Sequence, residues 1–377
     1  MRRKSFFSVL PLVVFLAPAL PQIPFFGGLG IALFAERQPA SAARRAAGEL
    51  DSMQARLRAA KQMLERRTPE STDFVTLAVE DAADSRIHLL KLAKTAFLNK
   101  DAEVLAKSSL GKTYRLRVVR SNYVNTSVRV TDEAGRELQP LLVQYPVEKN
   151  GALHEVAYYS SAHPAIHSPA LVTSGGAYVR RALDGAATRL AAKGKRISPD
   201  IVDVAERLCV VEHTDHKRFE AEDRASLYEE IYTLYALNSG DTYRFSVSSA
   251  GAGGMVQMIP PTYEAMRLMY PSVGLDPDFV EGMRDHGNAL EAMLLYMQGT
   301  WDGLLRSEQV RRALEEKTAT QAELLAAGYN SNPVRLPRYL ERGGEGWRTL
   351  IPEETKMYLR IYASVEGLVD FNDRPSS

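Results

Sequence analysis

The chain of 377 residues contains a single cysteine, Cys209, so no disulfide can form within it and packing must stabilise the fold. Hydrophobic residues make up 45% of the chain, which is enough for a large core, and the length suits two domains better than one. Cys209 lies in an apolar run that ends at Val211. We therefore expect a buried structural thiol at this position and not a nucleophile.

The overall charge gives no indication of a nucleic-acid partner. Lysine and arginine number 47 and aspartate and glutamate 46, so the formal net charge is +1. Without a global basic field we expect no binding to nucleic acid, although a local patch could still bind another anionic polymer.

The N-terminal segment is typical of an export signal. Arg2, Arg3 and Lys4 form a basic start, and no charged residue follows between Phe6 and Ala35. The uncharged run is long enough to span a bilayer, but its four prolines argue against one straight membrane helix. Ala-Ser-Ala at 40–42 resembles a cleavage site. We expect residues 1–42 to be either a cleaved signal peptide or a retained membrane anchor.

Hydrophobic periodicity predicts a helical segment over residues 43–110. Its first apolar residues recur at helical spacing and are Leu50, Met53, Leu57 and Leu64. A second set continues a helical pattern toward residue 106 and includes Ile87, Leu90 and Ala93.

From residue 112 onward the sequence shows the alternation typical of strands. Tyr114, Leu116 and Val118 alternate with other side chains, and further strands are predicted at 124–130 and 138–143. The pattern becomes mainly helical after Gly176. The expected fold class is therefore α+β: a helical segment at 43–110, a small β-rich subdomain at 111–170 and a mainly α-helical domain at 171–377.

One helix in this last region places a carboxyl group on its buried face. Ser198-Pro199 is a helix-start signal. The apolar stripe that follows consists of Ile201, Ala205, Leu208 and Cys209. Glu212 continues that stripe, and burial against apolar walls raises the pKa of a carboxyl group, as a general acid requires. On these residues alone, a buried glutamate paired with an arginine is the stronger interpretation.

A glycine-rich loop shifts the interpretation of Glu212 toward a catalytic acid. Residues 248–262 read Ser-Ser-Ala-Gly-Ala-Gly-Gly-Met-Val-Gln-Met-Ile-Pro-Pro-Thr. Glycines allow a backbone to approach a ligand closely, and no lysine follows them as in a phosphate-binding loop. A flexible linker would not continue directly into Met-Val-Gln-Met-Ile.

This segment resembles the Ser-x-x-Gly-Ala-x-Gly-Leu-Met-Gln-x-Met-Pro-x-Thr signature of the soluble lytic transglycosylases, which share the goose-type lysozyme fold. Two further segments are similar to the family in the same order: Ala-Gly-Tyr-Asn-Ser-Asn-Pro at 327–333 and Ile-Pro-Glu-Glu-Thr-Lys-Met-Tyr at 351–358. Together with the glutamate that ends the upstream helix, they cover about residues 195 to 370. The resemblance implies a lysozyme-like catalytic domain at 171–377.

The resemblance implies cleavage of peptidoglycan between N-acetylmuramic acid and N-acetylglucosamine, with a 1,6-anhydromuramic product and no cofactor or metal. Glu212 would be the single acid and base. The substrate-binding residues carried over are Ser248, Gln257, Ile259, Tyr329 and Asn330. The implied location is the periplasm or cell envelope, with membrane association through the N-terminal segment as an option.

The sequence departs from the family pattern after Glu212. His213 replaces the family's serine, and 36 positions separate Glu212 from Ser248. The additional residues include a predicted helix at 224–237 that ends at Asn238-Ser239-Gly240. Glu206 and Glu220 are weaker candidates for the acid, because the first falls off the apolar stripe and the second lies in a charged stretch.

Two other functions stay open at this stage. A hydrolytic muramidase would need a second carboxylate to activate water, and the insertion offers Asp215, Glu229, Glu230 and Asp241. A peptidoglycan-binding scaffold without turnover would retain the cleft alone. The histidine pairs His213/His216 and His163/His167 have spacings seen in metal sites, but neither matches a known zinc motif.

Overall fold

The computed structural model describes residues 40–375 apart from 241–250, and the side chains from residue 48 onward. The expected export signal therefore lies almost entirely outside the described residues, as do Ser248 and Asp241. Within the described part, no helix combines the length and the apolar character that crossing a membrane requires.

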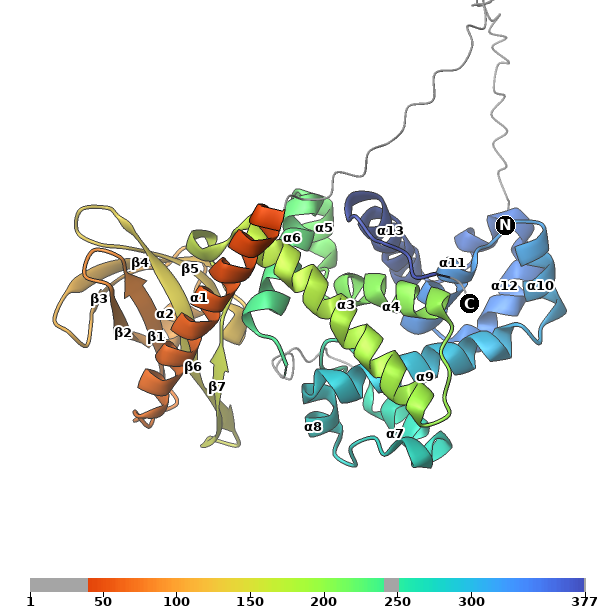
Figure 1. The fold of residues 1–377 in the computed structure, drawn as a ribbon, viewed down its shortest axis with the longest axis horizontal. Coiled ribbons are helices and arrows are strands. Elements are labelled where there is room, and N and C mark those ends of the chain that lie inside the picture. The colour runs from red at the N-terminus through yellow and green to blue at the C-terminus, as the bar shows by residue number, and fades with distance from the viewer. Residues whose placement is uncertain (1–39, 241–250, 376–377) are drawn as a thin grey trace, which may run out of the picture. The chain divides into compact units, whose positions relative to one another are not determined.

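The first half of the described chain forms a seven-stranded antiparallel sheet (Figure 1). The strands are β1 (Phe74–Asp81), β2 (Arg86–Ala93), β3 (Glu103–Lys107), β4 (Thr113–Arg120), β5 (Ser127–Thr131), β6 (Glu137–Lys149) and β7 (Ala152–Tyr159). Their order is β2-β1-β6-β5-β4-β3, and β7 pairs with β6. A bridge between Leu90 and Ser108 joins the two ends of this path, so the sheet nearly closes on itself.

Alternating side chains give the sheet its own core. In β4 the side chains of Tyr114, Leu116 and Val118 are buried, while Arg115 and Arg117 between them are exposed. A strand directs successive side chains to opposite faces, so this pattern buries one face and solvates the other. The buried face joins the main hydrophobic core of the molecule.

The expected fold class is wrong for the first half of the chain. Strands β1, β2 and β3 lie inside 43–110, which was predicted to be helical, and the sheet is much larger than a small subdomain at 111–170. In β2, Leu90 and Leu92 face the interior, whereas Leu89 packs on the outside. Apolar side chains on both faces interrupt the alternation of a strand, and Ile87, Leu90 and Ala93 then imitate helical spacing.

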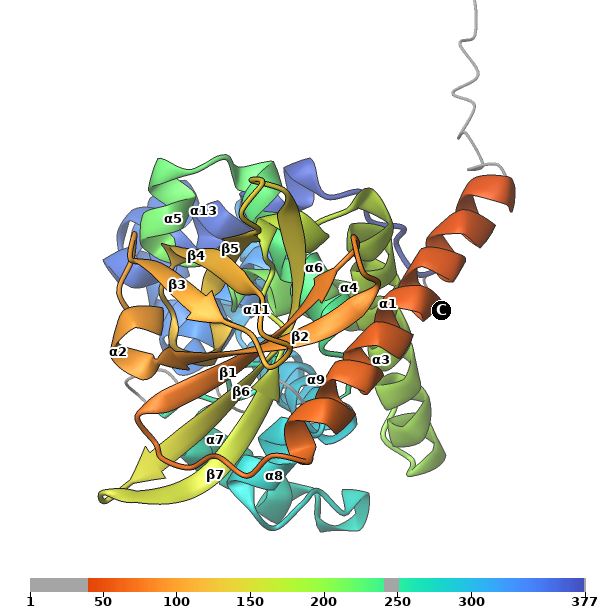
Figure 2. The ribbon, with the colours of Figure 1, turned by 90° about the vertical axis from the view of Figure 1, so that its left-hand side faces the viewer.

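Helix α1 (Ala40–Glu65) covers part of the outer face of the sheet (Figure 2). Its buried side chains are Met53, Leu57, Ala60 and Leu64. They form a second hydrophobic cluster with residues of the sheet, among them Ala78, Leu89, Leu141 and Leu142. The helical pattern predicted at the start of 43–110 is thus confirmed as far as Glu65. The apolar side of this helix buries part of the outer face of the sheet.

The second half of the described chain is helical. Its helices are α3 (Pro169–Ala192), α4 (Pro199–Val211), α5 (His216–Ala221), α6 (Arg224–Leu237), α7 (Pro260–Met269), α8 (Phe279–Arg284), α9 (His286–Leu304), α10 (Glu308–Glu315), α11 (Gln321–Asn330), α12 (Leu336–Gly343) and α13 (Glu353–Leu368), while the short α2 (Lys94–Phe97) belongs to the sheet region. Helix α4 lies at the centre of this helical region, and every residue from Ile201 to Val211 is buried. It packs against α3, α9, α11 and α13.

Candidate active site

Glu212 stands at the C-terminal end of α4. Its backbone N–H donates to the carbonyl of Leu208 at 2.9 Å, and the hydroxyl of Thr214 donates to the carbonyl of Val210 at 2.9 Å. These bonds satisfy carbonyls that a helix end otherwise leaves without partners. The predicted helix start is also confirmed at Pro199, although the Ser198 side chain makes no capping hydrogen bond. The end of the most buried helix therefore fixes the position of the Glu212 side chain.

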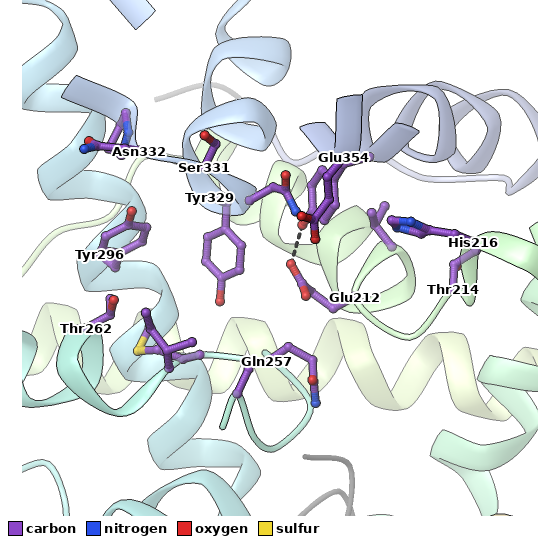
Figure 3. Close-up of a pocket in the computed structure, with 17 residues that line it drawn as sticks. Glu212, Thr214, His216, Gln257, Thr262, Tyr296, Tyr329, Ser331, Asn332 and Glu354 are labelled. Carbon is purple, nitrogen blue, oxygen red and sulfur yellow. Dashed lines mark hydrogen bonds between the residues drawn. The ribbon is translucent and has the colours of Figure 1, made fainter. Parts of the chain in front are cut away.

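Glu212 lines a cavity of about 660 Å³ (Figure 3). The cavity takes side chains from the end of α4, the glycine-rich loop, α7, α9, α11 and α13. Its other polar and aromatic lining residues are Thr214, His216, Gln257, Thr262, Tyr296, Tyr329, Asn330, Ser331, Asn332, Glu354 and Tyr358. A concave site with apolar walls, several hydroxyl and amide groups and one half-buried carboxyl group is suited to bind a polar ligand and protonate it.

Tyr358 of α13 donates a short hydrogen bond to Oε1 of Glu212. Burial raises the pKa of the Glu212 carboxyl group to about 8, against the opposing effect of the Tyr358 hydrogen bond and with a further contribution from the charge of Glu354. Burial acts most strongly because the ionised form loses hydration among apolar neighbours. Glu212 is consequently protonated at neutral pH and can donate a proton to a bound ligand.

The glycine-rich loop forms the wall opposite α13, and Figure 3 shows Glu212 between Gln257 and Glu354. Gly254 has φ +72°, and a Cβ atom there would lie 2.4 Å from the carbonyl oxygen of Met283. Only glycine fits this approach of the loop to α8. Gln257 also has a positive φ of +46°, and its Nε2 donates to the carbonyl of Gly254 at 2.9 Å. The loop is thus closed by its own hydrogen bonds beside the cavity.

The remaining candidates from the sequence lie around the same cavity. The Tyr329 hydroxyl donates to the carbonyl of Val256 at 2.7 Å, so it binds the glycine-rich loop and not Glu212. The Oδ1 atom of Asn330 accepts from the Thr355 hydroxyl at 2.9 Å, which ties α11 to α13. Ile259 has 38% of its surface exposed and provides an apolar edge.

Three of the four carboxylates that the insertion offers for a hydrolase are described, and none of the three lines this cavity. Asp215 caps α5 by accepting from the Arg218 backbone, and Glu230 is paired with Arg120 and Arg218. Glu229 is exposed on α6, and Asp241 is outside the described residues. The second carboxylate that lines the Glu212 cavity is Glu354.

The two weaker candidates for the acid do not line the cavity either. Glu206 is buried and paired with Arg180 and Arg374. Glu220 is exposed and lies 3.7 Å from Arg360. Glu206 therefore has the arginine pairing that was the alternative for Glu212.

The histidine pairs do not converge on a common point. His213 Nε2 contacts the carbonyl of Met255, whereas His216 lines the Glu212 cavity. His163 Nδ1 accepts from the Val128 backbone, and burial lowers the pKa of His163 to about 3. His167 contacts Thr233 and Glu229 on α6. Each imidazole thus has a separate local role.

A separate cluster of side chains, in the sheet, contains residue types that bind metals. Asp81, Asp84 and His88 bring their ligand atoms within 4.8 Å of one another on β1, β2 and their connection. The ammonium group of Lys112 lies 2.9 Å from Asp81 and 2.8 Å from Asp84. Lys112 therefore already supplies the positive charge that these carboxylates require.

Tyr358 and Glu354 were not assigned a role from the sequence. Both belong to the segment 351–358 that resembles the family's Leu-Pro-x-Glu-Thr-x-x-Tyr, and they lie four residues apart on α13. Residues four apart share a helix face, so both can point toward Glu212. The motif at 351–358 was the sequence signal that could have indicated these two residues. The contact between Tyr358 and Glu212, however, joins positions 146 residues apart in the sequence.

The chain was also compared with known proteins. No family model, no curated protein and no solved structure matches the chain.

Proposed function

We propose that the protein is a peptidoglycan lytic transglycosylase and that Glu212 is its catalytic acid and base. The observation that carries the proposal is the carboxyl group of Glu212, half-buried at the end of α4 and facing a cavity of about 660 Å³, with its pKa raised to about 8 by burial. The order of the three sequence segments that resemble the lytic transglycosylases supports the same activity.

In this mechanism Glu212 protonates the glycosidic oxygen between N-acetylmuramic acid and N-acetylglucosamine. That C–O bond breaks, and the acetamido group of the muramic residue stabilises the positive charge that develops at C1. The Glu212 carboxylate then removes the proton of the muramic C6 hydroxyl, whose oxygen bonds to C1 and closes the 1,6-anhydro ring. The attacking hydroxyl belongs to the substrate, so proximity favours the step and no water is added.

The other residues of the cavity would hold the glycan strand. Tyr296 and Tyr329 pack edge to face, with ring centroids 5.7 Å apart, and present aromatic surface to a sugar ring. Asn332 and Thr262 offer amide and hydroxyl groups to the sugar hydroxyls. We place the activity in the cell envelope, on the basis of the export-signal pattern in residues 1–42.

The test is a digest of purified peptidoglycan by the full chain and by the Glu212→Gln variant, with the products analysed by mass spectrometry. We expect products lighter by one water than those of hydrolysis, and a loss of at least about 1,000-fold in rate for Glu212→Gln, because glutamine cannot donate the proton. Glu220→Gln is the matched control, since Glu220 is exposed outside the cavity, and it should retain the wild-type rate.

The same digest contains the outcome against the proposal. Full activity of Glu212→Gln would exclude this residue as the acid. Binding of peptidoglycan without cleavage by either protein would leave a glycan-binding scaffold.

A hydrolytic muramidase is the second candidate, because Glu354 lines the same cavity as Glu212. Glu354 is exposed and therefore able to contact water, as the base of an inverting hydrolase must. Ordinary reducing ends in the digest, lost in Glu354→Gln, would favour hydrolysis. Anhydro products that persist in Glu354→Gln would favour the transglycosylase.

A further inference from the structure

A second cavity, of about 720 Å³, lies between the sheet and helices α5 and α6. One wall comes from the end of β4 and the turn after it, with Arg120, Asn122 and Asn125. The opposite wall comes from the start of α5 and from α6, with Lys217 and Glu230. The cavity is lined mainly by polar and charged side chains, so an apolar ligand would not fit it.

The connection between α4 and α5 separates this cavity from the one that contains Glu212. Glu212, Thr214 and His216 line the first cavity. His213 and Asp215, which alternate with them, line the second. The connection from Glu212 to His216 therefore borders both cavities beside the catalytic residue.

The arginines that line the second cavity are paired with acidic side chains. Arg120 and Arg218 are bound by Glu230, with N–O distances of 2.6 and 2.7 Å. Arg218 also binds Glu222 at 2.8 Å. These arginines and glutamates neutralise one another inside the cavity wall.

Lys100 and Lys217 are exposed and line the same cavity. Within residues 48–240 and 251–375 no carboxylate lies within 4.0 Å of either ammonium group. The nearby Asp215 is engaged as the cap of α5. Two exposed positive charges that line a polar cavity attract a ligand that carries carboxylates.

The turn at 123–125 adds groups that suit a peptide or sugar ligand. Tyr123 has φ +45°, which is uncommon for a residue with a side chain, and 72% of its surface is exposed. It stands between Asn122 and Asn125, whose side chains line the cavity. Strained backbone of this kind occurs often at binding sites, where it directs particular side chains toward a ligand.

We propose that the second cavity binds the carboxylate-bearing peptide stem of the glycan strand that is cleaved at Glu212, with Lys100 and Lys217 as its anion-binding residues. The proposal rests on the transglycosylase function above. A stem of five residues extends up to about 17 Å from its muramic acid, and the two cavities border the same connection between α4 and α5. Amides of the stem would bind the side chains of Asn122 and Asn125.

The test measures binding by full-length protein carrying Glu212→Gln, so that strands stay intact. Soluble glycan strands with their stems are compared with strands whose stems an amidase has removed, and the ratio of the two Kd values is the readout. We expect stem-bearing strands to bind about fivefold more tightly, as two exposed ion pairs allow. In Lys100→Ala/Lys217→Ala the ratio should approach one.

Lys149→Ala is the control, because Lys149 is an exposed lysine of β6 that does not line the cavity. It should keep the wild-type ratio. Strands whose stem carboxyl groups have been amidated should bind like stem-free strands. If they bind like stem-bearing strands, charge is not the basis and the assignment of the lysines is overturned.

Two results separate failure of this subsite from failure of the proposed function. Equal Kd values for stem-bearing and stem-free strands, with normal cleavage by the wild-type chain, overturn the subsite alone. No binding of either strand and no cleavage overturn both.

Discussion

At the scale of single residues, Glu212 is subject to opposing effects. Burial and the charge of Glu354 favour its protonated form, and the hydrogen bond from Tyr358 favours its carboxylate. In the proposed mechanism an acid later acts as a base, and such a balance suits both steps because either extreme would block one of the two proton transfers.

Replacing Tyr358 by phenylalanine should shift this balance toward the protonated form. The Tyr358 hydroxyl stabilises the carboxylate and so lowers the pKa of Glu212. Without it the pKa rises above about 8, and the decline of kcat/KM at high pH should move upward by about one to two pH units. The pH profile of cleavage measures this shift directly.

Tyr362→Phe is the matched control for Tyr358→Phe. Tyr362 lies one turn further along α13 and is buried, and its hydroxyl has no partner among the described residues. Its profile should match the wild type. A Tyr358→Phe profile that also stays in place would mean that the hydroxyl does not act on Glu212.

The sequence predicts part of this site from local pattern. The apolar residues from Ile201 to Cys209 predict that Glu212 is buried, and its raised pKa agrees with burial. Helix α4 is buried on all sides, so the stripe does not by itself separate Glu212 from the buried Glu206. Tyr358 and Glu354 reach the same cavity only through the packing of α13 on α4. Helical periodicity cannot give a contact between segments so far apart, so their roles required the structure.

At the scale of elements, the close packing of α3 on α6 depends on one glycine. A Cβ atom on Gly175 would lie 1.8 Å from the carbonyl oxygen of Tyr232. That oxygen belongs to the backbone of α6 and cannot turn aside as a side chain can. The two helices approach this closely because the position has no side chain.

Gly175→Ala should therefore force α3 and α6 apart. We expect a loss of about 3 kcal/mol or more in the free energy of unfolding, since overpacking against backbone cannot be relieved by a rotamer change. Chemical denaturation followed by circular dichroism measures it.

The adjacent Gly176→Ala provides the comparison. A Cβ atom there would meet only the Tyr232 ring at 3.8 Å, an ordinary contact. This variant should be neutral or stabilised by up to about 1 kcal/mol, because alanine favours helix. Equal stability of both variants would show that the helices adjust freely.

The helices were easier to predict than the first strands. The helix predicted at 224–237 is confirmed as α6, and its end at Asn238 follows the predicted stop signal. In β4, one face is solvated and the alternation is visible, so this strand was predicted as well. In β2, Leu89 is buried on one face and Leu90 and Leu92 on the other, so adjacent leucines interrupt the alternation.

At the scale of the whole molecule, polar contacts join the sheet to the helices. The Asn238 amide donates to the carbonyl of Ser160 at 2.7 Å, and its Oδ1 accepts from the Ser160 N–H at 2.9 Å. The ion pair of Arg120 with Glu230 links β4 to α6. Burial lowers the pKa of Arg120 and the charge of Glu230 opposes this, so the carboxylate compensates the buried guanidinium for its lost hydration.

Glu230→Gln should weaken this connection. The variant leaves Arg120 and Arg218 facing each other without a carboxylate between them, and we expect a loss of about 2 kcal/mol because the pair is only partly exposed. The denaturation midpoint measures the loss. High salt should reduce the difference from wild type by screening the repulsion.

The neighbouring Glu229→Gln serves as the control. Glu229 is exposed and contacts only His167 at 3.4 Å among the ion pairs of the described residues. Its effect should stay below about 0.5 kcal/mol. A Glu230→Gln variant as stable as this control would show that the ion pair does not hold the sheet to the helices.

The protonated state of Glu212 also affects how the fold tolerates pH. In the unfolded chain a glutamate ionises above its ordinary pKa of 4.5, whereas the folded chain keeps this proton until about pH 8. Between those values the unfolded state binds fewer protons, so rising pH lowers the free energy of unfolding. In neutral solution Glu212 therefore lowers the stability of the native state. The burial that keeps this carboxyl group protonated, and so able to donate a proton, destabilises the fold that contains it.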